Sequence, residues 1–175
     1  MFKLYRVVDV VRVPPEKFSK PLEEAVYEEL RRIYEGLISE EYGLIISIID
    51  VDVDPVGRIY LGDPASYHRV EFTMLTFNPF IKEVVEGEVA NIQSHGVFLN
   101  IGCTNGYIHV SQITDERAEY DPTRPALLLK SPTGIIEKND VLRARIYSLK
   151  MDSARGIRIH MTIKQPGLGK VSHGK

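Results

Sequence analysis

The chain has 175 residues, of which 43% are hydrophobic and 26% are charged, with 22 Lys and Arg residues against 24 Asp and Glu residues. That length fits one compact domain or two small ones, and the composition is typical of a folded globular protein. The longest apolar run is too short to span a membrane, and the first residues lack the apolar core of a signal peptide. The single cysteine, Cys103, excludes an internal disulfide and a Cys-rich zinc site. We therefore expect a cytoplasmic protein without a cofactor.

The first 80 residues predict an α+β domain with an antiparallel sheet and one main helix. Residues Phe2–Val13 are rich in Val and predict a strand, which two consecutive prolines end. The segments Leu44–Val53, Arg58–Leu61 and Val70–Met74 predict further strands, and the first of them also offers an apolar surface to a partner. Apolar residues at steps of three and four predict a helix whose buried stripe consists of Leu22, Val26, Leu30, Ile33 and Leu37.

The second half predicts an all-β domain. The helical period disappears after Glu83, and about 30 residues separate the third predicted strand from the fourth. Five short strands with one long connection are typical of a five-stranded OB-fold barrel. We place the boundary near Asn78–Lys82, giving domains 1–80 and 81–175. The predicted strands are Val84–Ile92, Val97–Ile101, Tyr107–Val110, Val141–Lys150 and Ile157–Ile163.

Charge is distributed unevenly between the two halves. Residues 1–80 carry a net charge of −5, whereas residues 81–175 carry +3. The last 35 residues, 141–175, have 8 basic residues against Asp152 alone, a net charge of +7. A local excess of cations favours contact with nucleic acid, which the overall charge of −2 conceals.

A dense motif runs through the second half. It comprises Gly87, Val89 and Ile92, then the run His95–Ile101, and then the run Gly106–Ser111 with Ile113. This pattern resembles the RNA-binding repeat of ribosomal protein S-one, an OB fold. The resemblance implies that RNA lies across the second and third strands. Five positions match the RNA-contacting residues of that family: His95, Phe98, His109, Asp152 and Arg158. At the position of His95 the family more often has an aromatic ring.

The residues themselves agree with an RNA-binding surface. Because side chains alternate along a strand, Val97, Leu99 and Ile101 face inward and Phe98 faces outward. An exposed ring beside cations suits single-stranded nucleic acid, although Phe98 packed under a loop and merely solvated cations remain an alternative. The cations of the last two strands and their turn are Arg143, Arg145, Lys150, Arg155, Arg158 and Lys164.

Motifs along the whole chain resemble the larger stalk subunit of archaeal and eukaryotic-type RNA polymerases, which in archaea is termed E or E-prime. Besides the barrel motif, these motifs include an insertion that contains Pro122. The chain departs from the family at Pro64, where the family usually has Gly. The other segments that carry the resemblance are Asp9–Pro15, Phe18–Leu22, Gly62–Phe72, Glu83–Val89 and Gln165–Lys170.

The resemblance implies a non-catalytic transcription subunit, because the polymerase active site lies in the large subunits. It implies a heterodimer with the smaller of the two stalk subunits, termed F, and contact between the barrel and nascent single-stranded RNA. It also implies support for DNA opening during initiation and for elongation. A truncated ribonucleoprotein-like N-terminal domain would dock on the polymerase core through a tip of two loops, which contain Pro14, Pro15, Phe18, Lys20, Gly62, Asp63, Pro64, Tyr67 and His68.

Other functions fit the sequence less well. The five histidines show no metal-ligand spacing, so no metal site is predicted. Nucleotide-binding and hydrolase motifs are absent from the sequence, which disfavours an enzyme such as a ribonuclease. The open alternatives are a translation-associated RNA-binding OB-fold protein and the homologous subunit of a eukaryotic polymerase, although the ending Gln165–Lys170 looks archaeal.

Overall fold

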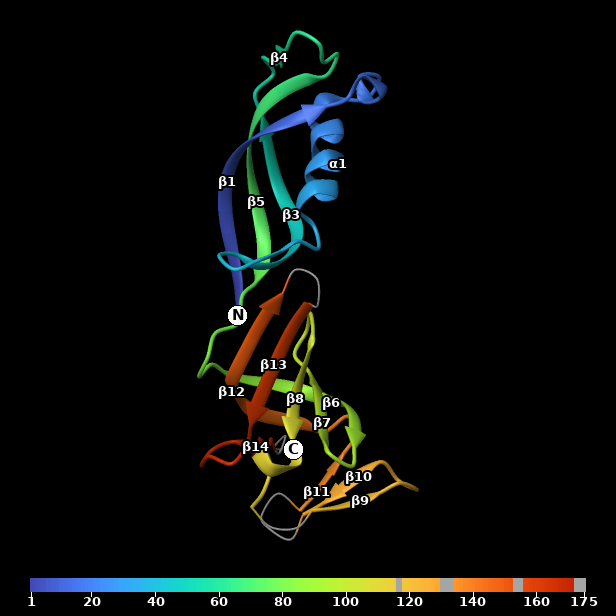
Figure 1. Ribbon diagram of the computed structural model, residues 1–175, viewed down its shortest axis with the longest axis vertical. Coiled ribbons are helices and arrows are strands. Elements are labelled where there is room, and N and C mark those ends of the chain that lie inside the picture. Colours follow the sequence, from blue (N-terminus) through green and yellow to red (C-terminus); the bar gives the residue numbers. More distant parts are fainter. Residues whose placement is uncertain (116–117, 130–133, 153–155, 172–175) are drawn as a thin grey trace. The chain divides into compact units, whose positions relative to one another are not determined.

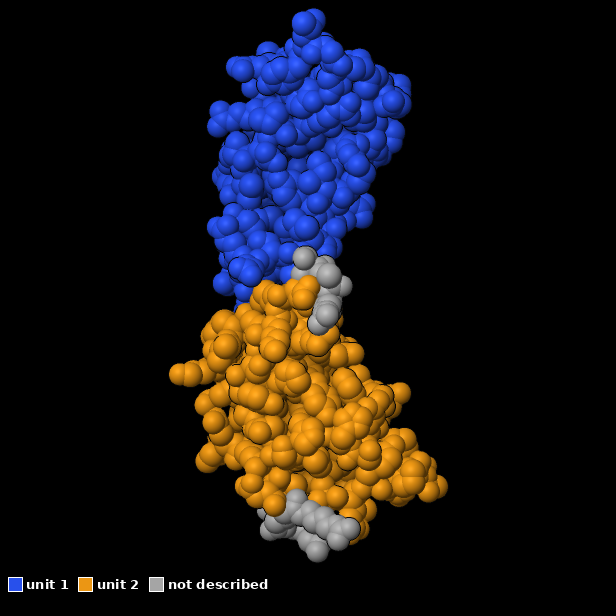
Figure 2. All heavy atoms as spheres, viewed as in Figure 1, with its two compact units in different colours: residues 1–78 blue, residues 79–175 orange. Residues whose placement is uncertain are grey.

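The computed structural model describes residues 1–115, 118–129, 134–152 and 156–171. The chain forms two compact units, residues 1–78 and residues 79–175 (Figure 2). They divide two residues before the boundary that the sequence analysis places at residue 80. None of the helices in the described residues is long and apolar enough to cross a membrane.

The first unit is an antiparallel sheet with a helix on one face (Figure 1). The sheet order is β1-β5-β3-β2, with β4 paired to β5, and β1 pairs with β5 along its full length. This arrangement confirms the predicted α+β domain. The elements are β1 (Phe2–Val13), the 3₁₀ turn η1 (Pro15–Lys17), α1 (Leu22–Tyr34), β2 (Ile38–Ser39), β3 (Gly43–Val53), β4 (Arg58–Ile59) and β5 (Ser66–Phe77).

The core of this unit lies between α1 and the sheet. Val26 and Leu30 of the helix are fully buried, and they pack with Phe72 and Met74 of β5. The predicted stripe is wrong beyond Leu30, because Ile33 and Leu37 are each 46% exposed. The helix ends at Tyr34, and Gly36 then adopts a φ of +83°, which turns the chain back toward β3.

The predicted partner surface on Leu44–Val53 is largely used within the domain. Ile45 and Ile48 are each 1% exposed and belong to the core, whereas Ile49 is exposed. The larger exposed apolar row lies on β1, a strand that has β5 as its only neighbour in the described sheet. The row consists of Phe2, Leu4, Val8 and Val10.

The second unit is a closed five-stranded barrel. The strands follow the order β13-β8-β7-β6-β12, and β12 also pairs with β13, which closes the ring. Among the described barrel strands, only the β8–β13 pairing is parallel. This ring confirms the predicted OB-fold barrel. Its elements are β6 (Val84–Gln93), β7 (Gly96–Asn100), β8 (Asn105–His109), the 3₁₀ turn η2 (Val110–Gln112), β12 (Val141–Asp152), β13 (Gly156–Thr162) and the short β14 (Gly169–Lys170), which pairs with β12.

The long connection between the third and fourth barrel strands forms a small sheet of its own. Its strands are β9 (Glu119–Asp121), β10 (Ala126–Leu128) and β11 (Ile135–Glu137), in the order β11-β10-β9. Leu127 lies opposite Ile136, and both side chains are buried. The sequence predicts only a connection here, because strands of three residues are too short to show a period.

Candidate nucleic-acid interface

Strands β7 and β8 present the outer face of the barrel that the sequence analysis assigns to RNA. Phe98 on β7 lies directly opposite Tyr107 on β8, and the centres of the two rings are 5.0 Å apart. Side chains alternate along each strand, so Val97, Leu99 and Ile108 point into the barrel and are buried. The predicted inward direction of Val97 and Leu99 is confirmed, and Phe98 is half-buried with the Tyr107 ring against it.

Tyr107 occupies the centre of this face, and a glycine makes room for it. A Cβ atom on Gly96 would lie 2.7 Å from the Tyr107 hydroxyl and 2.4 Å from the carbonyl oxygen of Ile108, so a larger residue does not fit. The Tyr107 hydroxyl donates a hydrogen bond of 2.9 Å to the carbonyl oxygen of His95. Partial burial raises the pKa of Tyr107, which keeps this hydroxyl protonated as a donor.

Three imidazole rings surround Tyr107. The distances from its ring centre are 6.0 Å to His95, 6.3 Å to His109 and 5.8 Å to His160. His109 is oriented by Ser111, whose Oγ lies 2.8 Å from Nδ1 and whose backbone N–H donates to Nδ1 at 3.2 Å. His95 and His109 are predicted from the sequence to lie on this face, whereas Tyr107 and His160 are not among the predicted residues. The alternation of side chains along a strand is enough to predict Tyr107 on this face, because it lies two residues before His109. His160 lies on β13 and is brought to this face by the pairing of β13 with β8.

Tyr107, His95 and His160, but not His109, border a hollow of about 420 Å³ on the barrel surface. Apolar and aromatic groups supply most of its lining, and one cation lies at it, so the hollow suits a flat group attached to an anion. In the described part of the chain, no group of three or more His, Cys, Asp or Glu side chains is arranged to hold a metal ion. The hollow is lined by His95, Phe98, Asn105, Tyr107, Ile157, Arg158, Ile159 and His160.

A β-bulge decides which cations reach this face. The register between β12 and β13 shifts between Ile146 and Ser148, so Tyr147 is the extra residue. Before the shift the even-numbered residues of β12 point inward, and after it they point outward. Lys150 is therefore exposed and lies directly opposite Arg158 on β13. Neither of these two cations forms an ion pair with any residue that the structure describes.

Two other predicted cations are already paired with carboxylates. The Nη2 atom of Arg143 lies 2.7 Å from Glu86 on β6, and its Nε donates to the same oxygen at 2.8 Å. Lys164 forms an ion pair with Asp115. Because both are exposed pairs, each cation reaches a phosphate only by exchanging one anion for another.

The remaining predicted positions on this face differ in what surrounds them. Arg145 is half-buried on β12, and its Nε atom is buried without a hydrogen-bond partner among the described residues. Asp152 is exposed at the end of β12, on the same side as Lys150. Arg155 lies outside the described residues.

The predicted docking tip begins where β1 ends. Pro14 caps the 3₁₀ turn η1 in an extended conformation, and Pro15 occupies its first position, where a missing N–H costs nothing. Phe18 follows the turn and is 53% exposed. An apolar ring is thus held at the surface by a turn of restricted conformation.

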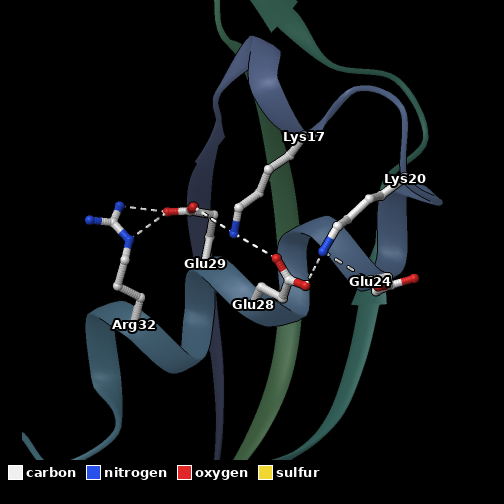
Figure 3. Close-up of polar contacts among 6 residues, drawn as sticks. All are labelled: Lys17, Lys20, Glu24, Glu28, Glu29 and Arg32. Atoms are coloured by element: carbon white, nitrogen blue, oxygen red, sulfur yellow. Dashed lines mark hydrogen bonds and ion pairs between the residues drawn. The ribbon is translucent and has the colours of Figure 1, made fainter.

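Ion pairs attach this turn to α1 (Figure 3). The Nζ atom of Lys17 lies 2.8 Å from Glu28 and 3.0 Å from Glu29, and Lys20 also contacts Glu28. Glu29 is only 3% exposed, and its second oxygen accepts from Arg32 at 2.5 Å and 3.0 Å. A buried carboxylate is tolerated because both of its oxygens are bonded to cations.

The second predicted loop is held by Asp63. Arg12 of β1 donates to both oxygens of Asp63 at 2.8 Å, the Tyr67 hydroxyl donates at 2.7 Å, and the backbone N–H of Ala65 donates at 3.0 Å. These donors, chiefly Arg12, hold the pKa of Asp63 well below its usual range. Asp63 therefore remains ionised and fixes the turn that precedes β5.

His68 does not belong to an exposed loop, and this part of the predicted tip is wrong. Tyr67 and His68 lie within β5, and His68 is only 6% exposed. Its Nδ1 lies 2.9 Å from the carbonyl oxygen of Asp54 and its Nε2 lies 3.1 Å from Ser66 Oγ. The ring also fills the space beside Gly57, where a Cβ atom would lie 2.5 Å from it. His68 thus supports the turn from inside.

An exposed apolar cluster around β4 was missed by the sequence analysis. Ile59 and Leu61 are 72% and 108% exposed, and Val56 and Tyr60 are also exposed. Ile59 and Phe18 line the same hollow of about 310 Å³, so the cluster adjoins the predicted tip. The strand predicted at Arg58–Leu61 would have its side chains covered by a sheet. In the structure only Arg58 and Ile59 pair with β5. Gly62 and Pro64 are exposed in the following turn.

Family models match both units of the chain. Residues 8–64 match the SHS2 domain found in the N terminus of Rpb7p/Rpc25p/MJ0397. Residues 78–162 match the S1 RNA binding domain.

Relatives match nearly the whole chain. It is 41% identical over 172 residues to DNA-directed RNA polymerase subunit Rpo7 of Saccharolobus shibatae, covering 98% of this chain and 96% of that protein. The Rpo7 protein of Sulfolobus acidocaldarius is 41% identical over 171 residues, covering 98% and 93%. DNA-directed RNA polymerase II subunit rpb7 of Schizosaccharomyces pombe is 27% identical over 162 residues, covering 91% and 92%. Because the two Rpo7 proteins are 41% identical to it over nearly the whole chain and both domain models match, the chain belongs to the Rpo7 family of DNA-directed RNA polymerase subunits.

Proposed function

We propose that the chain is the larger, non-catalytic stalk subunit of a cytoplasmic DNA-directed RNA polymerase. In this role it binds nascent single-stranded RNA through the barrel and docks on the polymerase core through the N-terminal tip. It forms a heterodimer with the smaller of the two stalk subunits and supports DNA opening and elongation. Membership of the Rpo7 family supports the general role, and the surfaces described above support its individual parts.

The observation that carries RNA binding is the ring face, beside which lie two cations that form no ion pair with the described residues. Phe98 and Tyr107 offer flat surfaces on which a base can stack, and Arg158 lines the same hollow. Single-stranded RNA exposes both its bases and its phosphates, so rings and cations act on the two parts of each nucleotide. Binding of this kind tolerates many sequences, as a subunit that meets every transcript requires.

The exposed apolar tip supports docking on protein. Phe18, Ile59 and Leu61 are large apolar side chains that face solvent in the isolated chain. Burying each of them against a partner would contribute about 1.5–3 kcal/mol. The bonds of Asp63 and Glu29 fix the two segments that carry these side chains, which lowers the conformational entropy lost on docking.

The outer face of β1 supports a second protein partner, for which we propose the smaller stalk subunit. Its exposed Phe2, Leu4, Val8 and Val10 alternate along one side of a strand. A strand with an open edge and an apolar face is prone to association unless another chain covers it.

RNA binding is tested by replacing the ring that the face depends on. We expect Phe98→Ala to weaken binding of single-stranded RNA by about fivefold to a hundredfold, the range of one stacked base. Filter binding with the protein purified together with its smaller partner measures this change. Phe80→Ala, which removes an exposed ring of the same unit that does not line the hollow, is the matched control and should bind normally. Equal affinities for Phe98→Ala and the unmodified protein would contradict the proposed face.

A further inference from the structure

Tyr147 is an exposed aromatic residue that the RNA-binding surface described so far does not use. It is the extra residue of the β-bulge in β12, and it is 44% exposed. Its hydroxyl has no hydrogen-bond partner in the described part of the chain. Bulges interrupt the ladder and redirect a side chain, and they are common beside functional sites. The bulge thus leaves a large aromatic ring at the barrel surface.

The bulge brings Tyr147 into line with the rings of the RNA face. The ring centres of Tyr147 and His160 are 6.2 Å apart, those of His160 and Tyr107 are 5.8 Å apart, and those of Tyr107 and Phe98 are 5.0 Å apart. The four residues come from β12, β13, β8 and β7, which are consecutive neighbours in the barrel. Four adjacent strands span about 14 Å, which is too wide for a single stacked base.

The cations beside Tyr147 point to an anion at this end of the row. Lys150 and Arg158 lie directly opposite each other on β12 and β13, and both are exposed without an ion pair among the described residues. Like charges directly opposite in a ladder repel each other. A phosphate between the two side chains would remove that repulsion.

We infer that Tyr147 and His160 form a second base-stacking platform, separate from the Phe98–Tyr107 pair, with the adjoining phosphate held between Lys150 and Arg158. The inference rests on the proposed binding of single-stranded RNA by this face. It extends the RNA path across β13 onto β12, so that the strand crosses the barrel with at least two bases stacked.

The test compares two substitutions of Tyr147. Tyr147→Ala removes the ring, and we expect it to weaken binding of an oligoadenylate of about twelve nucleotides by about fivefold to a hundredfold. Tyr147→Phe keeps the ring and should bind as the unmodified protein does. Filter binding measures the affinities, and thermal unfolding checks that both variants fold. Phe80→Ala, which removes an exposed ring of the same unit that does not line the hollow, is the matched control.

The outcomes separate this platform from the proposed function. Independent platforms predict that the factors lost in Tyr147→Ala and Phe98→Ala multiply in the double variant. If Phe98→Ala loses affinity while Tyr147→Ala does not, the second platform is wrong and RNA binding by the face stands. If neither variant loses affinity, the RNA-binding face itself is wrong. If Tyr147→Phe loses as much RNA affinity as Tyr147→Ala, base stacking on Tyr147 is wrong, because the phenylalanine ring could still stack.

Discussion

At the scale of single residues, the basic side chains of the barrel differ in whether they form an ion pair with a carboxylate among the described residues. Arg158 and Arg143 both lie on exposed positions of barrel strands. Arg158 forms no ion pair with the described residues, whereas Arg143 is held by Glu86 at 2.7 Å. The sequence cannot distinguish them, because Glu86 lies 57 residues before Arg143 and meets it only when β6 and β12 pair.

This difference predicts distinct salt dependences. The logarithm of the RNA association constant falls with the logarithm of salt concentration by about 0.7 for each phosphate contact with a single strand. We expect Arg158→Gln to make that slope shallower by about 0.7, whereas Arg143→Gln should leave it nearly unchanged. Filter binding over a series of salt concentrations measures both slopes. If the slope changes as much in Arg143→Gln as in Arg158→Gln, the ion pair with Glu86 does not keep Arg143 from contacting a phosphate.

At the scale of secondary-structure elements, ion pairs fix the short turn η1 on α1. Lys17, the last residue of the turn, contacts Glu28 and the buried Glu29, and Lys20 in the following segment also contacts Glu28. A 3₁₀ turn of three residues has little stability of its own, so its position depends on these contacts. The ion pairs with α1 therefore help the turn to hold the exposed Phe18 in its position.

The same contacts predict sensitivity to acid. Hydrogen bonds from Lys17 and then Lys20 lower the pKa of Glu28 from its ordinary value of 4.5 to about 2. A lowered pKa in the folded state means that the stabilisation is complete above the unfolded value and is lost as the pH falls toward the folded value. We expect the melting temperature of the helical circular dichroism signal to fall between about pH 5 and pH 2. That signal reports on α1, the one α-helix among the described residues.

Glu28→Gln should lessen this decline, because the amide has no proton to gain over that range. Glu23→Gln on the first turn of the same helix is the control, since Glu23 has no ion pair with the described residues. If the melting temperatures of both variants fall with pH as much as that of the unmodified protein, the contacts of Glu28 do not contribute to acid sensitivity.

At the scale of the whole molecule, two compact units carry opposite net charges and different kinds of exposed surface. The residues before Pro79 have a net charge of −5 and an exposed apolar tip, whereas the rest have +3 and the ring face. Apolar surface suits a protein partner, and cations with rings suit single-stranded RNA. The proposed function therefore assigns the two kinds of binding to different units.

This separation predicts that the two kinds of binding can be lost independently. Phe18→Ala and Leu61→Ala should each weaken association with polymerase core that lacks this protein by about tenfold to a hundredfold, from the apolar area no longer buried. RNA affinity should persist in both variants. Phe98→Ala should show the reverse pattern. Pull-down of the core and filter binding of RNA, performed on the same preparations, measure both properties, and parallel losses in both assays would argue against separate units.

Much of the fold could be predicted from the sequence. The long strands, the start of the helix and the five barrel strands show clear periods, because each buries one face along its length. The three-residue strands of the inserted sheet show no period, and the end of the helix depends on Gly36 rather than on the apolar pattern. Phe98 was predicted from alternation, whereas His160 and Tyr147 join the ring row through pairing between distant segments.

Local patterns of apolar residues, together with motifs, are enough to predict the two domains, their families and the outward direction of Phe98. The folded chain is needed to show which cations have no ion pair with the described residues, that His68 is buried, and that four rings form one row across the barrel. Ion pairing, burial and ring contacts depend on distances between strands remote in sequence, which no local pattern contains. A one-residue bulge at Tyr147 reverses which side chains of β12 face outward, and that reversal is settled by pairing with β13.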